Sequence, residues 1–455
     1  MLTRYRRTED GRVAAKALVY TQAEHRIDRS GIDPDALRIV GRLHEAGHEA
    51  YIVGGAVRDL LLGRRPKDFD IVTDAQPSVI RRVFRSARVI GRRFRLVHVY
   101  AGPKIFEVST FRSIANGTVG NEYGTIDEDA RRRDFTLNAL YFDPFESLVI
   151  DYVGGFKDIA AKKVKPVIPL ATIFKEDPVR MIRCLKYASI TGFTIPLSLR
   201  LALRRDASLL AEASTSRLTE EFVKILGSGV SNPVLGSLSR YKLLRHMLPQ
   251  AAELCAEDKN FCAAHYQGLS ELDAYASDPA VEKRLSILLG FYLRPFLESV
   301  PGRIADTTDA YREALREARQ FLAPLNPPRV ELEAAVLVVF KRRGISPLQK
   351  PNRQGAPDHR SREDAALGGD GKRDTRSSEA GTGAADTVAP RKRRKRRRSG
   401  SKTGPYEASD SSIEAGAGGD AKLKADSESP TAPSPRRRRG RRGSGSTPSK
   451  APDGA

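Results

Sequence analysis

The amino-acid composition changes abruptly at about Ser346, and this change limits where the chain can fold. Beyond that point Gly, Ser, Ala, Pro and charged residues dominate, and Tyr406 is the only aromatic residue. A segment of this kind cannot bury enough apolar surface to offset the conformational entropy that ordering would cost. We therefore expect residues 346–455 to be a disordered tail, and the preceding residues to hold a core of useful size.

Positive charge is spread over both the expected tail and the expected folded part. The whole chain has a formal net charge of +22, and residues 346–455 hold 25 Lys and Arg against 14 Asp and Glu. This balance favours a polyanionic partner such as nucleic acid over a protein that is merely basic at its surface. Two runs, RKRRKRRR at 391–398 and RRRRGRR at 436–442, are expected to contact RNA or RNA-processing proteins. A role in solubility is the alternative.

The cysteines and the hydropathy pattern bear on the compartment. Cys184, Cys255 and Cys262 are odd in number and form no CxxC pair, which favours reduced thiols. No apolar run approaches the roughly 20 residues that span a bilayer. The first residues, MLTRYRRTEDGRVAAK, lack the apolar segment of a secretory signal. The sequence therefore predicts a cytoplasmic protein that has no membrane partner.

Hydrophobic periodicity predicts an α+β head followed by helices. Asp33 and Pro34 are typical of a helix N-cap and first position, and Gly47 would end that helix. Strands are expected at 50–53, 68–72, 136–142 and 148–152, helices at 57–62 and after Pro77, and a hairpin from 94–100 and 105–111. From about 172 to 341 the pattern is helical almost throughout. The expected divisions are an N-terminal extension (1–30), a head (31–155), a helical neck (156–230), a helical body (231–345) and the tail (346–455).

A glycine pair follows the first expected strand of the head. Gly54 and Gly55 lie between that strand and a helix, so their backbone N–H groups can approach a phosphate closely. Arg58 lies one helical turn further on and can add charge-assisted hydrogen bonds to a triphosphate. An ordinary turn is the alternative interpretation of such a pair.

Three carboxylates near this loop are candidates for metal binding. Asp68 and Asp70 are two residues apart in an expected strand, so both point to one face while Phe69 points into the core. Carboxylates held together favour a divalent cation that prefers oxygen ligands. Glu107 lies in another apolar run and needs a ligand or partner. The alternatives are a solvated acidic pair and a glutamate on an edge strand.

The motifs taken in order resemble one enzyme family. They read GGAVRDLLLG (54–63), KDFDIVT (67–73), RRRDFTLNAL (131–140), EDPVR (176–180) and SRLTEEFVKIL (216–226). This series resembles the class II tRNA nucleotidyltransferase/poly(A) polymerase family over roughly residues 22–230. Several ordered motifs together are much more specific than any one of them alone.

The resemblance implies a polymerase-β-like nucleotidyltransferase head with a mixed sheet, followed by a helical neck and a body that binds RNA. Asp68 and Asp70 would bind two Mg²⁺ ions, and Glu107 would complete the metal site. One ion would activate the RNA 3′-hydroxyl and the other would stabilise the leaving pyrophosphate. These three residues and Asp134 form the expected catalytic set.

The resemblance also implies how ATP is bound. Arg132 and Arg133 would hold the triphosphate, and Asp134 would orient the ribose hydroxyls. Asp177 and Arg180 would read the Watson–Crick edge of the incoming base in place of a template. Because Pro178 follows it, Asp177 has capping of a helix as its alternative role. The nucleotide-binding candidates are Gly54, Gly55, Arg58, Asp59, Arg132, Arg133, Asn138, Asp177 and Arg180.

The family contains enzymes that add A repeatedly and enzymes that restore the CCA end of tRNA. VIGRRFRLVHV (89–99) and AEHRIDRSGID (23–33) resemble bacterial poly(A) polymerases, whereas CCA-adding relatives tend to carry a GTVTV-like strand at the first position. The segment between Arg112 and Arg131 is short for a poly(A) polymerase. We expect a poly(A) polymerase that uses ATP and acts on the 3′ ends of mRNA and other RNAs. CCA addition and a non-enzymatic RNA-binding adaptor are the alternatives, and the intact carboxylates argue against the adaptor.

Overall fold

The computed structural model of the chain describes residues 2–7, 13–91, 96–115, 117 and 122–346. All of them lie within one compact unit. The two basic runs and the other predictions about residues 347–455 lie outside the described residues.

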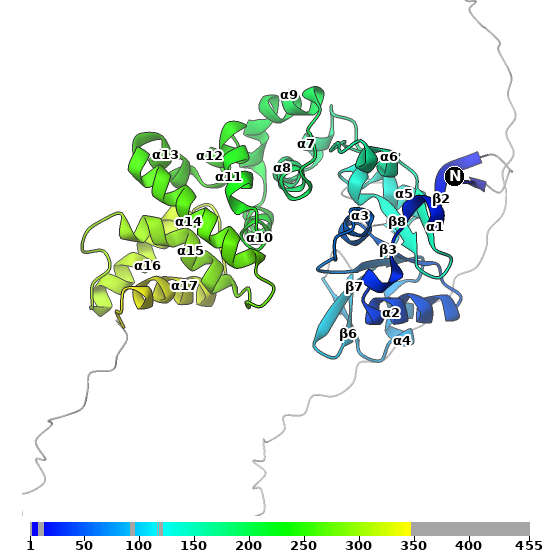
Figure 1. Ribbon diagram of the computed structural model, residues 1–455, viewed down its shortest axis with the longest axis horizontal. Coiled ribbons are helices and arrows are strands. Elements are labelled where there is room, and N and C mark those ends of the chain that lie inside the picture. Colours follow the sequence, from blue (N-terminus) through cyan, green and yellow to red (C-terminus); the bar gives the residue numbers. More distant parts are fainter. Residues whose placement is uncertain (1, 8–12, 92–95, 116, 118–121, 347–455) are drawn as a thin grey trace, which may run out of the picture. The chain divides into compact units, whose positions relative to one another are not determined.

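A nine-stranded mixed sheet forms the head, as predicted (Figure 1). Its order is β1-β2-β9-β8-β3-β4-β7-β6-β5, and among the strand pairs of the described residues only β4 and β7 run parallel. The strands are β1 (Leu2–Arg7), β2 (Val13–Thr21), β3 (Ala50–Val53), β4 (Asp70–Thr73), β5 (Ala87–Ile90), β6 (Leu96–Ala101), β7 (Lys104–Thr110), β8 (Leu140–Asp143) and β9 (Leu148–Asp151).

The described part of the head also contains six α-helices. They are α1 (Gln22–His25), α2 (Pro34–Glu45), α3 (Gly55–Leu61), α4 (Pro77–Val83), α5 (Ile126–Arg131) and α6 (Gly155–Ala160). Helix α2 packs beside β3 and β4, and α4 packs beside β5 and β6, so both cover one face of the sheet (Figure 1). Ile71, Val97, Val99 and Val108 are buried on that face. Along β6 and β7, buried side chains alternate with more exposed ones, because successive side chains point to opposite faces of the sheet.

Several predicted elements are confirmed with small shifts of their ends. Strand β3 has the predicted bounds, the hairpin is formed by β6 and β7, and α2 begins at Pro34 after the Asp33 cap, whose side chain accepts a hydrogen bond from the Asp35 amide. Strand β4 begins at Asp70, so Asp68 precedes the strand rather than lying in it.

Two other predictions about local structure were incomplete. The expected strand over 136–142 begins only at Leu140, because Thr136–Asn138 forms a 3₁₀ turn. The Thr136 hydroxyl donates to Asp158 and its amide to the Lys165 carbonyl, so these groups find partners outside the sheet. Strands β1, β2 and β5 and helix α5 were not predicted. Strand β2 pairs with β9 and extends the sheet of the head.

The chain from about 172 onward is helical, as predicted (Figure 1). The helices are α7 (Ile173–Glu176), α8 (Val179–Thr191), α9 (Leu197–Arg205), α10 (Thr215–Leu226), α11 (Ser231–Arg240), α12 (Leu244–Met247), α13 (Pro249–Glu257), α14 (Lys259–Ser277), α15 (Leu285–Glu298), α16 (Thr308–Leu322) and α17 (Arg329–Arg342). Short 3₁₀ turns occur at Arg29–Gly31 and Ala207–Glu212.

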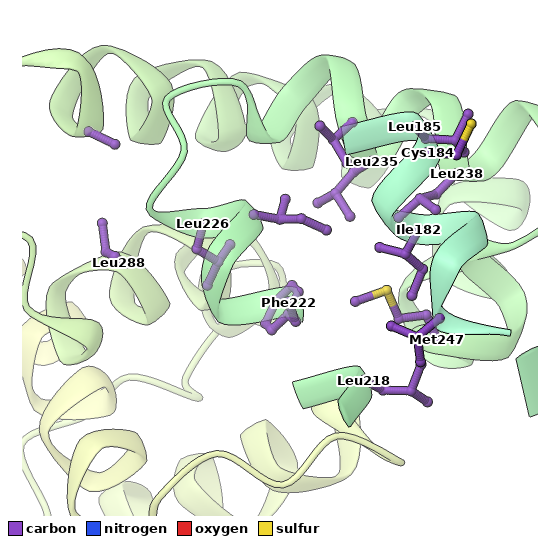
Figure 2. Close-up of a cluster of buried hydrophobic side chains, with 14 of the residues drawn as sticks. Ile182, Cys184, Leu185, Leu218, Phe222, Leu226, Leu235, Leu238, Met247 and Leu288 are labelled. Carbon is purple, nitrogen blue, oxygen red and sulfur yellow. The ribbon is translucent and has the colours of Figure 1, made fainter. Parts of the chain in front are cut away.

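Buried side chains from several helices meet between α8 and α10. Figure 2 shows Ile182 and Leu185 of α8 beside Leu238 of α11, with Leu235 of α11 and Phe222 of α10 in the same cluster. All five are essentially inaccessible to solvent. This packing fixes α8 and α10 against each other, and both helices also carry charged side chains on other faces.

Within the part of the chain that the structure describes, no helix has both the length and the apolar character to cross a membrane. The three cysteines are free thiols.

Replacing Phe222 by Ala should destabilise the helical part strongly. Phe222 is fully buried and its ring lies edge-on to that of Tyr292, with 5.0 Å between centroids. We expect the free energy of unfolding to fall by about 3–5 kcal/mol, because a cavity replaces the ring. Urea unfolding monitored by circular dichroism measures this free energy. Leu201→Ala, at a side chain that is 55% exposed on α9, is the control and should change it by less than about 0.5 kcal/mol.

Candidate nucleotide-binding and catalytic site

A cavity of about 980 Å³ lies between the head and helices α8 and α10. Most of the predicted site residues line it, although they come from distant parts of the sequence. Those that do are Gly54, Gly55, Arg58, Asp68, Asp70, Arg132, Arg133, Asp134, Asn138, Asp177 and Arg180. Asp59 and Glu107 are not among the residues that line it.

The glycine loop gives the cavity one of its walls. Gly54 connects β3 to α3 with a φ of +73°, which is the left-handed region that favours glycine. A Cβ at Gly54 would lie 3.7 Å from Arg133 Nη1 and 3.9 Å from Asp70 Oδ2. The backbone of this loop therefore lies close to the cationic side chain of Arg133 and to the anionic side chain of Asp70.

Arg58 is buried behind this loop and holds Asn138. Its Nη1 donates to Asn138 Oδ1 over 2.9 Å, and its Nε donates to Asp59 Oδ1 over 2.8 Å. Asp59 therefore supports the site through Arg58. The buried Nδ2 of Asn138 has no hydrogen-bond partner among the described residues, so it is available to an acceptor on a ligand.

Two carboxylates that are close in sequence line the cavity. Asp70, at the first residue of β4, and Asp68 are exposed to it, whereas Phe69 between them is buried. Surrounding protein atoms and the nearby Glu107 and Asp68 raise the pKa of Asp70 to about 6, although Arg133 acts in the opposite direction. This mutual repulsion fits a divalent cation bound by Asp68 and Asp70.

Glu107 of β7 lies next to Asp70 of β4, because Ile71 pairs with Val108. Its Oε1 lies 3.8 Å from His98 Nε2 on the neighbouring strand β6. Among the described residues, no three His, Cys, Asp or Glu side chains converge into a metal site. The role of Glu107 as a third ligand therefore stays a prediction, since Glu107 is not among the residues that line the cavity.

Arginines gather at the adjoining part of the cavity. Burial and the neighbouring Arg112 lower the pKa of Arg132 to about 10, and burial also lowers the pKa of Arg112. Arg133 is anchored by Asp129, whose Oδ2 accepts from its Nη2 over 2.8 Å and from the Tyr141 hydroxyl over 2.8 Å. Crowded guanidinium groups repel one another, and a polyanion such as a triphosphate relieves that repulsion.

Asp134 and helix α8 are joined by a buried ion-pair network. Arg183 Nε donates to Asp134 Oδ2 over 2.6 Å, and Arg183 Nη1 donates to Glu221 Oε1 of α10 over 3.0 Å. Lys186 donates to the other oxygen of Glu221. Burial alone would raise the pKa of Asp134, but Arg183 and the Phe135 amide outweigh it and hold that pKa below its usual value.

Asp177 lies immediately before α8 and is paired with α10. Arg217 donates to both of its carboxylate oxygens, over 2.7 and 2.6 Å. The Val179 amide also donates to Asp177 Oδ1 over 3.2 Å, so the capping interaction considered from the sequence is present. Arg180 Nε lies 3.7 Å from Asp177 Oδ2, and Arg180 Nη1 donates to the Ile173 carbonyl over 3.3 Å. Both predicted base-reading side chains are thus held in place by the protein.

Sequence reasoning missed several residues that line this cavity, among them Arg112, Arg183, Lys186, Arg217 and Lys224. A signal for some of them was present. Arg180, Arg183 and Lys186 recur every three residues of an otherwise apolar helix, which places three cations near one face. No comparable local pattern identifies Arg217, whose partner lies 40 residues earlier.

Comparisons with known proteins found related sequences. Residues 50–165 match a family model described as the poly A polymerase head domain, and residues 192–255 match one described as a probable RNA and SrmB-binding site of polymerase A. Poly(A) polymerase I of Escherichia coli O6:H1 is 40% identical over 256 residues, which are 53% of this chain and 55% of that protein.

Two further relatives show the range of similar proteins. Poly(A) polymerase I of Haemophilus influenzae is 34% identical over 300 residues, covering 62% of this chain and 66% of that protein. The CC-adding tRNA nucleotidyltransferase of Halalkalibacterium halodurans is 39% identical over 190 residues, covering 42% of this chain and 48% of that protein. The chain therefore spans about half to two thirds of the length of these relatives.

Replacing Arg183 by Ala should destabilise the protein, because Asp134 and Glu221 would then lose a partner that both share. We expect the free energy of unfolding to fall by about 3 kcal/mol. Chemical denaturation at neutral pH measures the loss. The control is Arg200→Ala at an exposed position of α9. Equal stability of both variants would show that Arg183 does not tie the two carboxylates together.

Proposed function

We propose that the chain is a member of the class II tRNA nucleotidyltransferase/poly(A) polymerase family and acts as a template-independent poly(A) polymerase. It would transfer AMP from ATP to the 3′ ends of mRNA and other RNAs and release pyrophosphate. The reducing cytoplasm suits its free thiols. The observation that carries the proposal is that one cavity brings the carboxylates of Asp68 and Asp70 together with the arginines Arg112, Arg132 and Arg133.

This combination of charges matches the needs of nucleotidyl transfer. Mg²⁺ held by Asp68 and Asp70 would activate the attacking hydroxyl and neutralise charge on the transferred phosphate. The arginines would bind the β- and γ-phosphates, which become the leaving pyrophosphate. The Gly54 turn would allow the triphosphate to approach the backbone beside Arg133 and Asp70.

The remaining groups of the cavity would orient the nucleoside. Asp134 is charged and held by Arg183, so its acceptor positions can receive the ribose hydroxyls. Asn138 Nδ2 offers a donor to the sugar or the phosphates.

Adenine recognition would fall to Asp177 and Arg180. A carboxylate has about four acceptor positions, so the pairing of Asp177 with Arg217 leaves room for the amino group of adenine. Arg180 would donate to a ring nitrogen of the same base. Because Arg217 holds the Asp177 carboxylate from two sides, its orientation is set before the base arrives.

Repeated addition of A is favoured over CCA addition by two observations. The match to poly(A) polymerase I of Escherichia coli extends over 256 residues, compared with 190 for the CC-adding relative. The segment VIGRRFRLVHV also resembles poly(A) polymerases. The 39% identity to the CC-adding protein makes CCA addition the second candidate.

The decisive experiment supplies the purified chain and Mg²⁺ with an unstructured RNA oligonucleotide or with tRNA that lacks its last three nucleotides. ATP and CTP are added singly and together. A long ladder from ATP alone on the oligonucleotide supports the proposal. Addition that ends after C, C and A on tRNA would replace poly(A) synthesis with CCA addition, and no product on either RNA would contradict both.

Asp70→Ala should reduce the rate of AMP addition by several orders of magnitude, because a lost metal ligand removes charge stabilisation from the transition state. Primer extension under single-turnover conditions measures the rate, and circular dichroism checks that the variant folds. Asp309→Ala, at a side chain that is 91% exposed on α16, is the control and should retain the full rate. Near-normal activity of Asp70→Ala would rule out metal binding by this residue.

Arg180→Ala should reduce the preference for ATP over CTP, because a donor to the base is lost. The ratio of kcat/KM for the two nucleotides should fall by about tenfold or more. Arg204→Ala, an exposed arginine on α9, provides the comparison. An unchanged ratio in the Arg180 variant would remove this residue from base recognition.

A further inference from the structure

One face of the sheet leads from Asp70 across β7 and β6 to the edge strand β5. Strands β4 and β7 pair with Ile71 beside Val108, so Asp70 and Glu107 are neighbours on the other face. Glu107 lies opposite His98 of β6, and His98 lies opposite Arg88 of β5. Residues directly opposite each other share a face. Arg88 and His98 therefore lie on the face that carries Asp70.

This face is covered at one end of the sheet and accessible at the other. Over β3, β4 and β8, Tyr51, Val72 and Tyr141 are buried together with Ile126 and Ala130 of α5. Over β5, β6 and β7, Ile90 and Ile105 are 36% and 53% exposed, and His98 and Tyr100 are only half-buried. We call Arg88, Ile90, His98, Tyr100 and Ile105 the open face.

The open face combines apolar and aromatic side chains with the guanidinium of Arg88. Tyr100 lies opposite Ile105, and Ile90 lies opposite Leu96, so the two pairs flank the Arg88–His98 pair. The Glu107 carboxylate lies on the same face beside His98, on the side nearest Asp70. Aromatic groups on a sheet, accompanied by arginine, suit the unstacked bases and phosphates of single-stranded nucleic acid.

We propose that the open face binds the single-stranded RNA segment immediately upstream of the 3′-terminal nucleotide. The proposal rests on the proposed function, because it takes RNA as the substrate at Asp70. From β4 to β5 there are three strand spacings, about 14 Å in all, which is a distance that a few nucleotides can span. Tyr100 stacks on an upstream base, and Arg88 contacts a phosphate. Both are positioning residues that act on the RNA and not on ATP.

The test compares Tyr100→Ala with Tyr100→Phe in primer extension by the full chain. Tyr100→Ala should raise the KM for an RNA oligonucleotide by about tenfold, with kcat and the KM for ATP unchanged within twofold, because a stacking contact is lost. Tyr100→Phe should restore the KM, since it keeps the ring. Tyr5→Ala removes an exposed tyrosine from the edge strand β1 and should have no effect. A dinucleotide primer, which is too short to reach Tyr100, should be extended equally by all variants.

Arg88→Ala tests the phosphate contact by salt dependence. It should reduce the slope of log Kd against log salt for the RNA oligonucleotide by about 0.7, as one phosphate contact is lost. Arg38→Ala, an exposed arginine on α2, should leave that slope unchanged. An unchanged slope for Arg88→Ala would overturn the phosphate contact.

A crosslink separates failure of the open face from failure of the proposed function. RNA with a single 4-thiouridine near its 3′ end is irradiated on the wild-type chain without ATP, and the attached peptide is found by mass spectrometry. Attachment within 88–105 supports the open face even if no nucleotide is added to RNA. Attachment elsewhere, or an equal KM for Tyr100→Ala and wild type, would overturn it even if poly(A) is made.

Discussion

Arg183 joins two buried carboxylates that come from different parts of the chain, and the site depends on that junction. Asp134 belongs to the head and Glu221 to α10, while Arg183 itself lies on α8. A buried carboxylate without a partner is very costly, so these ion pairs restrict α8 and α10 to positions where every charge is matched. The apolar packing around Phe222 supplies the attraction between the helices, and the ion pairs select their orientation (Figure 2).

The cavity held in this way brings together groups of like charge. Burial together with Glu107 and Asp68 raises the pKa of Asp70, and burial together with Arg112 lowers the pKa of Arg132. Folding energy from the sheet and the helical core maintains both repulsions until ligands neutralise them. The raised pKa of Asp70 and the lowered pKa of Arg132 both result from burial beside groups of like charge. A metal and a polyphosphate bound side by side would relieve both at once.

Local sequence patterns predicted most of the helices and strands, because the signals for these elements lie in neighbouring residues. Strand β3 is an apolar run that ends at a glycine pair, and α2 begins at an Asp-Pro cap, so each has a signal within a few residues. Strand β1 and the turn at Thr136–Asn138 have no such signal. Strand β1 is polar and exists only because β2 pairs with it, and Thr136 is held by Asp158, 22 residues away.

The candidate site shows the same contrast between features encoded locally and features that depend on distant residues. By itself the sequence determined which motifs carry the chemistry, and it set Asp68 and Asp70 on either side of the buried Phe69, because the spacing of side chains along an extended backbone is a local property. Only the tertiary structure decided that Arg217 holds Asp177, that Arg183 holds Asp134, and that Glu107 faces His98 outside the cavity. These contacts depend on how helices and strands distant in sequence pack together, and packing is a property of the whole fold.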